Sequence, residues 1–77
     1  MPTIKRFKNG RIMIYPREHG IPHFHVEFLD GDRCGVAIET LDILSGTIRP
    51  MNKLDEALDW AAENRSLLLK KWKEITR

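Results

Sequence analysis

The chain has 77 residues, of which 42% are hydrophobic and 31% are charged. This composition is typical of one small globular domain spanning residues 1–77 and excludes a disordered or low-complexity protein. The formal net charge of +2 is smaller than that of a protein whose whole surface binds nucleic acid.

Cys34 is the one cysteine, so the chain cannot form an internal disulfide. Secreted domains of this size usually depend on disulfides. No stretch of the sequence has the apolar length of a signal peptide or of a membrane span. We therefore expect a cytoplasmic protein that does not enter a membrane.

The first predicted element in the chain is a β-hairpin centred on Asn9-Gly10. An Asn-Gly pair between alternating apolar residues favours a type I′ turn, in which both central residues have positive φ. The strands that this turn predicts are residues 3–8 and 11–15. The expected cross-strand neighbours are Phe7 with Ile12, and Lys5 with Ile14.

A loop over residues 16–22, marked by two prolines and a glycine, precedes the third predicted strand, His23 to Leu29. Side chains of this strand alternate between two faces. The apolar face carries Phe24, Val26 and Phe28. The polar face carries His23, His25 and Glu27.

The fourth predicted strand, Arg33 to Ile38, alternates in the same way, with Cys34 on its apolar side. We expect a three-residue loop, Asp30 to Asp32, because a two-residue loop would turn the apolar sets of the two strands to opposite faces. The expected neighbours are Phe28 with Cys34, Val26 with Val36, Glu27 with Gly35, and His25 with Ala37. Small residues would then leave room above the polar face.

Residues 41–49 are ambiguous between a loop and a short fifth strand around a Ser45-Gly46 turn. After Pro50, apolar residues recur at three- and four-residue steps, which predicts an amphipathic helix with Asn52 as its N-cap. The apolar stripe consists of Leu54, Leu58, Ala61, Leu68, Trp72 and Ile75.

The stripe is interrupted at residues 64–66, which predicts either a kink or a second helix capped by Ser66. The predicted fold is therefore α+β: an antiparallel sheet of four to five strands with a C-terminal amphipathic helix, kinked or split, packed on one face. The polar face of the third strand would be the open one.

All three histidines lie between residues 19 and 25. His23 and His25, two apart on a strand, point to the same side with Cα atoms roughly 6.6 Å apart, so their imidazoles can converge on one metal ion. His19 is the expected third ligand, and Glu27 an expected ligand, orienting group or general base. Such a set indicates a divalent metal, zinc or similar, with an open coordination position. Further candidates at the edges are Glu18, Asp30 and Glu39.

Two other uses of His19, His23, His25 and Glu27 stay open. Without metal, the histidines would perform acid–base catalysis on a phosphodiester, with Arg17 nearby. In a structural role, they would pair with carboxylates and support the 16–22 loop, or contact a partner. The sequence does not decide whether the chain is an enzyme.

The basic N-terminal hairpin is a second candidate surface, because residues 1–17 contain no acidic side chain. Nucleic acid or an acidic partner would be contacted by such a surface. The alternative is a solvated edge that prevents sheet-to-sheet aggregation. The candidate contact residues are Lys5, Arg6, Arg11 and Arg17.

Several segments together resemble a family of short prokaryotic proteins known as domain of unknown function 4160. They are Met1-Pro2-Thr3-Ile4, Glu18-His19, Pro22-His23-Phe24-His25-Val26, Trp60-Ala61 and Leu68 to Trp72. The Pro-His-Phe-His core is the most specific, and Ile21 replaces a common family proline. The resemblance implies no established activity. Family members often occur beside another small gene, which implies a toxin–antitoxin-like pair with a small protein encoded nearby.

The leading hypothesis is therefore a small accessory protein that binds a protein or nucleic acid through its histidine-rich strand face. The alternative is a metal-assisted or histidine-based phosphodiester hydrolase.

Overall fold

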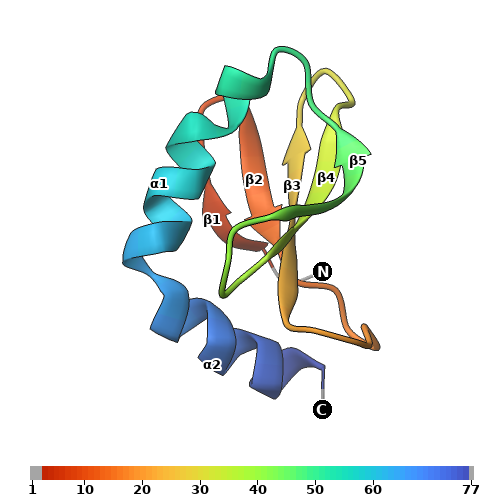
Figure 1. The fold of residues 1–77 in the computed structure, drawn as a ribbon, viewed down its shortest axis with the longest axis vertical. Coiled ribbons are helices and arrows are strands. Elements are labelled where there is room, and N and C mark those ends of the chain that lie inside the picture. The colour runs from red at the N-terminus through yellow and green to blue at the C-terminus, as the bar shows by residue number, and fades with distance from the viewer. Residues whose placement is uncertain (1–2, 77) are drawn as a thin grey trace.

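The computed structural model, which describes residues 3–76, consists of a five-stranded antiparallel sheet and a C-terminal helical segment (Figure 1). The predicted α+β fold is confirmed, and a fifth strand is present. The strands, in their order across the sheet, are β1 (Thr3–Arg6), β2 (Gly10–Met13), β3 (His23–Phe28), β4 (Arg33–Ala37) and β5 (Ile43–Thr47). The helical segment consists of the 3-10 turn η1 (Met51–Leu54) and the helices α1 (Asp55–Glu63) and α2 (Arg65–Ile75). Met1, Pro2 and Arg77 lie outside the described residues.

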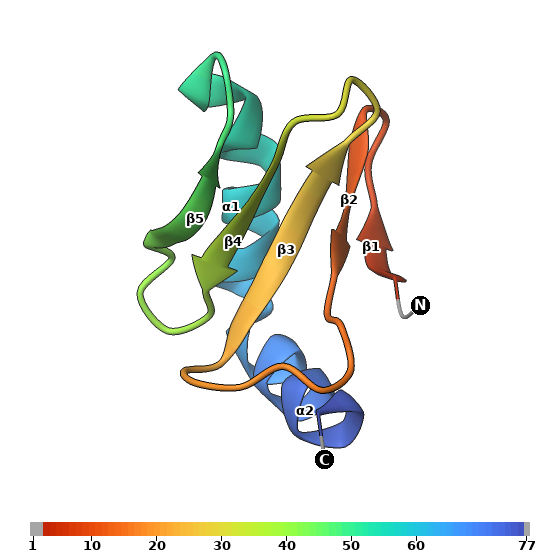
Figure 2. The same ribbon diagram turned by 90° about the vertical axis from the view of Figure 1, so that its right-hand side faces the viewer.

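The helices cover one face of the sheet, and the other face is free of them (Figures 1 and 2). Helix α1 runs along the sheet, and α2 turns beneath the end at which β3 begins. The predicted interruption is a split at Asn64, whose backbone leaves the helical region and whose Nδ2 donates to the Trp60 carbonyl at 2.8 Å. Ser66 as the cap was wrong, since Asn64 occupies that position. Asn52 as an N-cap was also wrong, because it lies inside η1.

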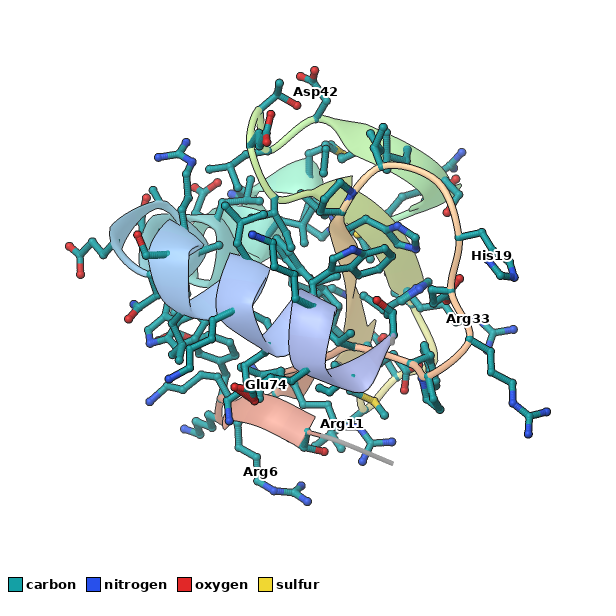
Figure 3. All side chains as sticks on the ribbon, turned by 90° about the horizontal axis from the view of Figure 1, so that it is seen from below. Arg6, Arg11, His19, Arg33, Asp42 and Glu74 are labelled. Atoms are coloured by element: carbon teal, nitrogen blue, oxygen red, sulfur yellow. The ribbon has the colours of Figure 1, made fainter. Side chains whose placement is uncertain are left out.

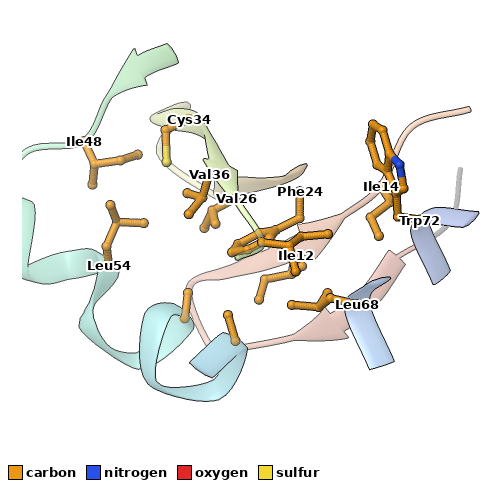
Figure 4. Close-up of a cluster of buried hydrophobic side chains, with 13 residues drawn as sticks. Ile12, Ile14, Phe24, Val26, Cys34, Val36, Ile48, Leu54, Leu68 and Trp72 are labelled. Atoms are coloured by element: carbon orange, nitrogen blue, oxygen red, sulfur yellow. The ribbon is translucent and has the colours of Figure 1, made fainter. Parts of the chain in front are cut away.

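The hydrophobic core lies between the helices and the inner face of the sheet (Figure 4). Each large side chain that is fully buried there stabilises the fold by roughly 1.5–3 kcal/mol. All six residues of the predicted helical stripe lie in this core or pack against it. The core residues are Ile12, Ile14, Phe24, Val26, Cys34, Val36, Ile38, Ile48, Leu54, Ala57, Ala61, Leu68 and Trp72. No helix within residues 3–76 is long and apolar enough to cross a membrane.

The first hairpin is present, but its predicted register was wrong. Its turn is centred on Lys8 and Asn9, with the Phe7 N–H donating to the Gly10 carbonyl at 2.7 Å. Gly10 belongs to β2, where a Cβ would lie 2.6 Å from the Glu27 carbonyl oxygen. The glycine therefore permits close approach of β3 and does not serve the turn. The observed pairs are Thr3 with Met13, Lys5 with Ile12, and Arg6 with Arg11.

The loop between β3 and β4 has three residues, as predicted, but it consists of Leu29 to Gly31. Gly31 has φ +100°, the left-handed conformation that the last residue of a three-residue hairpin loop requires. The pairing is therefore shifted by two residues from the prediction, which leaves the faces unchanged. The observed pairs include Val26 with Cys34, His25 with Gly35, and Glu27 with Arg33.

The predicted turn at Ser45-Gly46 was wrong, because both residues lie within β5. The chain reverses before β5, where Leu41 has positive φ. Gly46 has φ +83°, and a Cβ there would lie 2.8 Å from the Cys34 Cα. The pairing of β5 with β4 shifts register between Ser45 and Ile43, opposite Gly35 and Val36, which is the behaviour of a β-bulge.

Candidate metal centre on the outer face of the sheet

The face of the sheet opposite the helices, here called the outer face, carries the polar residues of β3 (Figure 2). Pairing across the sheet aligns two rows of side chains on it. One row is Met13, His25, Gly35 and Ser45. The other row is Arg6, Arg11, Glu27, Arg33 and Thr47. The predicted division of β3 into an apolar inner face and a polar outer face is confirmed.

Glu18, His23 and His25 form the centre of the outer face. One donor atom from each of these residues lies within 4.8 Å of the other two. The Oε1 of Glu18 is 2.8 Å from the Nε2 of His25, and its Oε2 is 3.5 Å from the Nε2 of His23. All three side chains are partly buried, so the carboxylate joins two imidazoles at the edge of solvent.

The tautomer of His23 follows from the contact of its second ring nitrogen. This nitrogen, Nδ1, lies 2.9 Å from the Ile21 carbonyl oxygen. A carbonyl only accepts hydrogen bonds, so this nitrogen carries the proton, and in the neutral ring the Nε2 keeps its lone pair. Metal-binding histidines are commonly held in this way.

Aromatic contacts fix the two imidazole rings in place. The rings of His23 and His25 meet edge to face, with centroids 5.2 Å apart. Tyr15 packs against His25 at 4.8 Å, and Trp72 of α2 packs against His23 at 4.9 Å. Helix α2 therefore supports the centre directly, although Trp72 also belongs to the core.

The 16–22 loop carries Glu18 back over the start of β3. Arg17 and Gly20 have positive φ, which turns the chain on both sides of Glu18. The end of the loop is anchored by the Pro22 carbonyl, which accepts from the Ile38 N–H at 3.0 Å. The end of the loop is thereby held to the residue that follows β4.

His19, the expected third ligand, is exposed and points away from the molecule (Figure 3). Within residues 3–76, the group able to hold a metal consists of Glu18, His23 and His25. The Glu18 carboxylate thus takes the position that was expected for the His19 imidazole. The sequence placed both residues in the same loop but contained no signal for which one turns inward.

Glu27 lies one step along β3 from His25, outside this group. It accepts hydrogen bonds from the Tyr15 hydroxyl and from Arg11, the latter at 3.4 Å. The hydrogen bond to Glu27 and, secondarily, burial raise the pKa of Tyr15 above its usual value. Glu27 is therefore already engaged by two donors and borders the metal-binding group without joining it.

The other acidic candidates lie elsewhere. Asp30 and Asp32 hold the Lys53 ammonium at 2.6 and 2.9 Å, which joins the segment between β3 and β4 to η1. These contacts lower the pKa of both aspartates and raise that of Lys53. Glu39 is exposed in the loop before β5.

The predicted basic surface is divided between the two sides of the sheet. Lys5 lies toward the helices, 5.9 Å from the Phe7 ring centroid, in a hollow that acidic residues of α1 also line. Arg11 forms its ion pair with Glu27 on the outer face. Arg6 is exposed on β1, and Arg17 is exposed in the 16–22 loop. These four residues therefore do not form one continuous patch.

Arg33 is the outer-face residue that the sequence analysis missed. It lines a hollow of about 400 Å³, here called the outer hollow, beside the Glu18–His23–His25 group. Its polar lining also includes Tyr15, Glu18, His25, Glu27 and Ser45. The register of β3 with β4, which places Arg33 beside Glu27, was the missing information.

A family model described as domain of unknown function (DUF4160) matches residues 10–73. The matched segment contains all residues of the outer face from β2 to β5, and it does not include Met1-Pro2-Thr3-Ile4. No curated protein and no solved structure matches the chain.

Proposed function

The chain belongs to the DUF4160 family, and since the description of that family names no activity, we propose its function from the geometry of the outer face. We propose that Glu18, His23 and His25 bind a divalent metal ion and that the metal-loaded face binds nucleic acid. The observation that carries this proposal is the Glu18 carboxylate, whose two oxygens each face one imidazole nitrogen.

The distances suit a shared metal ion. Nitrogen and oxygen ligands at about 2.0–2.2 Å from one ion, at ordinary coordination angles, lie roughly 3.0–3.5 Å from each other. The carboxylate–imidazole distances of 2.8 and 3.5 Å, one from each Glu18 oxygen, lie close to this range, and one donor atom of each residue lies within 4.8 Å of the other two. Two histidines and one carboxylate also leave coordination positions open, as in sites that bind or activate an exogenous oxygen ligand.

Nucleic acid is the expected partner because phosphate oxygens are good ligands for such an ion. The row of Arg6, Arg11 and Arg33 crosses the outer face close to the metal-binding group. Guanidinium groups favour phosphate by charge and geometry. The outer face is not covered by the helices, so it suits an extended strand better than an enclosed small molecule.

Binding of labelled single-stranded and duplex oligonucleotides, with and without nickel, tests this proposal. We expect binding that requires metal, weakens with salt and is lost in Glu18→Gln. His19→Ala is the matched control, because His19 lies next to Glu18 but points away. Equal binding by Glu18→Gln and His19→Ala, or none by the wild type, would contradict the proposal.

Hydrolysis of a phosphodiester is the second candidate function. A metal ion with open positions lowers the pKa of a bound water and polarises a phosphoryl oxygen. The outer hollow beside His25 gives room for that water. Cleavage of a labelled RNA or DNA by the metal-loaded protein, abolished in His25→Ala with the fold retained, is the expected result. Tight binding without cleavage would contradict hydrolysis and support binding as the function.

As part of the same proposal, this protein forms a toxin–antitoxin-like pair with a small protein encoded nearby. The pair would act in the cytoplasm. Purification of the tagged protein from its native host should recover that partner. A monomer recovered without it would contradict the pairing. A protein partner that binds without metal would show that the outer face serves protein recognition and not nucleic acid.

A further inference from the structure

We propose that Arg33 and Ser45 bind a phosphate group in the outer hollow, and that this subsite becomes favourable for an anion only when the metal is bound. The inference rests on the metal site proposed above and names two residues that the sequence analysis did not assign. Both side chains line the hollow beside His25 and Glu18.

The absence of a side chain at Gly35 leaves a gap between Ser45 and His25, two residues that line the outer hollow. Gly35 lies between His25 on β3 and Ser45 on β5 in the paired sheet. A Cβ at this position would lie 3.0 Å from the Ser45 Oγ and 3.8 Å from the His25 ring. Gly35 is therefore the floor of a gap whose two sides are a hydroxyl and an imidazole.

Arg33 supplies a guanidinium that has no direct ion-pair partner among residues 3–76. It lies directly across from Glu27, yet Glu27 forms its ion pair with Arg11 on the other side. Within residues 3–76, Arg33 takes part in no ion pair. It is exposed at the rim of the outer hollow, where it is free to contact a bound anion.

The charge balance makes anion binding depend on the metal. Without metal, the carboxylates of Glu18 and Glu27 offset the guanidiniums of Arg11 and Arg33. A divalent ion at Glu18 adds two positive charges next to the hollow. An oxyanion would then contact the metal, Arg33 and the Ser45 hydroxyl together. The two ligands are thus coupled, and phosphate should also tighten metal binding by the same factor.

Calorimetric titration of inorganic phosphate into nickel-loaded protein tests the subsite, after excess metal has been removed. We expect measurable binding by the loaded wild type and none by metal-stripped protein. Arg33→Gln should weaken phosphate binding by about tenfold, the effect of losing roughly 1.4 kcal/mol, while nickel binding in the absence of phosphate is retained. Arg65→Gln on α2 is the matched control for net charge and should bind phosphate like the wild type.

Gly35→Ala provides a second variant, because its Cβ fills the gap without requiring a strained backbone. It should retain nickel binding and lose phosphate binding. Equal phosphate affinity in the wild type, Arg33→Gln and Gly35→Ala would overturn the subsite and leave the metal site standing. Failure of the wild type to bind nickel would instead overturn the proposed metal site and this inference with it.

Discussion

Tyr15 connects the two rows of the outer face, since its ring packs on His25 while its hydroxyl donates to Glu27. That hydrogen bond stabilises the protonated hydroxyl and, together with burial, raises the pKa of Tyr15 above about 10. Because Tyr15 is the only tyrosine, the near-ultraviolet absorbance of tyrosinate follows this group alone. The pH midpoint of the Tyr15 titration in the folded protein should lie above the midpoint in the denatured chain. In the Glu27→Ala variant, the folded-state midpoint should fall toward the denatured value.

The same contact predicts how stability changes in alkali. The folded protein holds the Tyr15 proton more tightly than the unfolded chain, so this contribution is fully present below about pH 10. It is lost as pH rises through the higher folded pKa. Tyr15→Phe should lack this pH dependence in urea unfolding experiments. A folded-state midpoint at or below that of the denatured chain would contradict the predicted contact.

Cys34 gives a simple test of burial. Its side chain is 3% exposed, and desolvation raises the pKa of the thiol. Only the thiolate attacks thiol reagents rapidly. Native protein should therefore react with a disulfide reagent far more slowly than the urea-unfolded chain. Equally fast reaction of both states would show that Cys34 is accessible.

At the scale of single residues, the sequence predicts the part of the candidate site that lies on a strand, because side chains alternate there. Alternation in His23 to Phe28 correctly placed His23 and His25 side by side on the open face. The sequence indicates Glu18 only as a candidate at the edge of the site, and it contains no signal for Arg33. Both depend on how a loop turns and how two strands align, which no local pattern in the sequence encodes.

Among the structural elements, β5 contains a glycine that combines positive φ with no room for a side chain. Gly46 has φ +83° and no room for a side chain, whereas Gly20 has φ +89° and nothing near its missing Cβ. Gly20→Ala should therefore cost only the left-handed strain, about 1–2 kcal/mol. Gly46→Ala should cost more, because its Cβ also meets the backbone of β4. The free energies of unfolding in urea give the comparison.

If the two glycine substitutions destabilise the protein equally, the close contact of β5 with β4 is not significant.

The close contact of Gly46 with β4 explains why the Ser45-Gly46 prediction failed. A glycine pattern that is typical of turns was used here to bring two strands together, as it also was at Gly10. Strand identities and faces were predictable from alternation, but registers were not, because they depend on these long-range contacts.

At the scale of the whole molecule, folding and metal binding should be coupled. The ligands come from the 16–22 loop and β3, and Trp72 of α2 supports His23. A metal that binds only the folded protein stabilises it by about 2.7 kcal/mol when its concentration is 100 times the Kd. In a chain of this length that corresponds to a rise in Tm of roughly 10 °C or more. Nickel should raise the Tm of the wild type and leave that of His25→Ala unchanged.

An equal rise in Tm for both proteins would mean that nickel binds elsewhere.

The packing that joins the ligands to the rest of the protein was itself predictable, since the sequence predicts the helical stripe from Leu54 to Ile75. The position of α2 beneath the histidine strand was not, because it follows from the split at Asn64 and the direction of the second helix (Figure 1).

The most direct test of the central claim is calorimetric titration of metal-stripped protein with zinc, manganese and nickel. Wild type and His19→Ala should bind one ion per chain with similar affinity. Glu18→Gln and the His23→Ala/His25→Ala double variant should lose that binding while circular dichroism shows that they remain folded. Absence of binding by the wild type, or equal binding by all four proteins, would contradict the metal site of Glu18, His23 and His25.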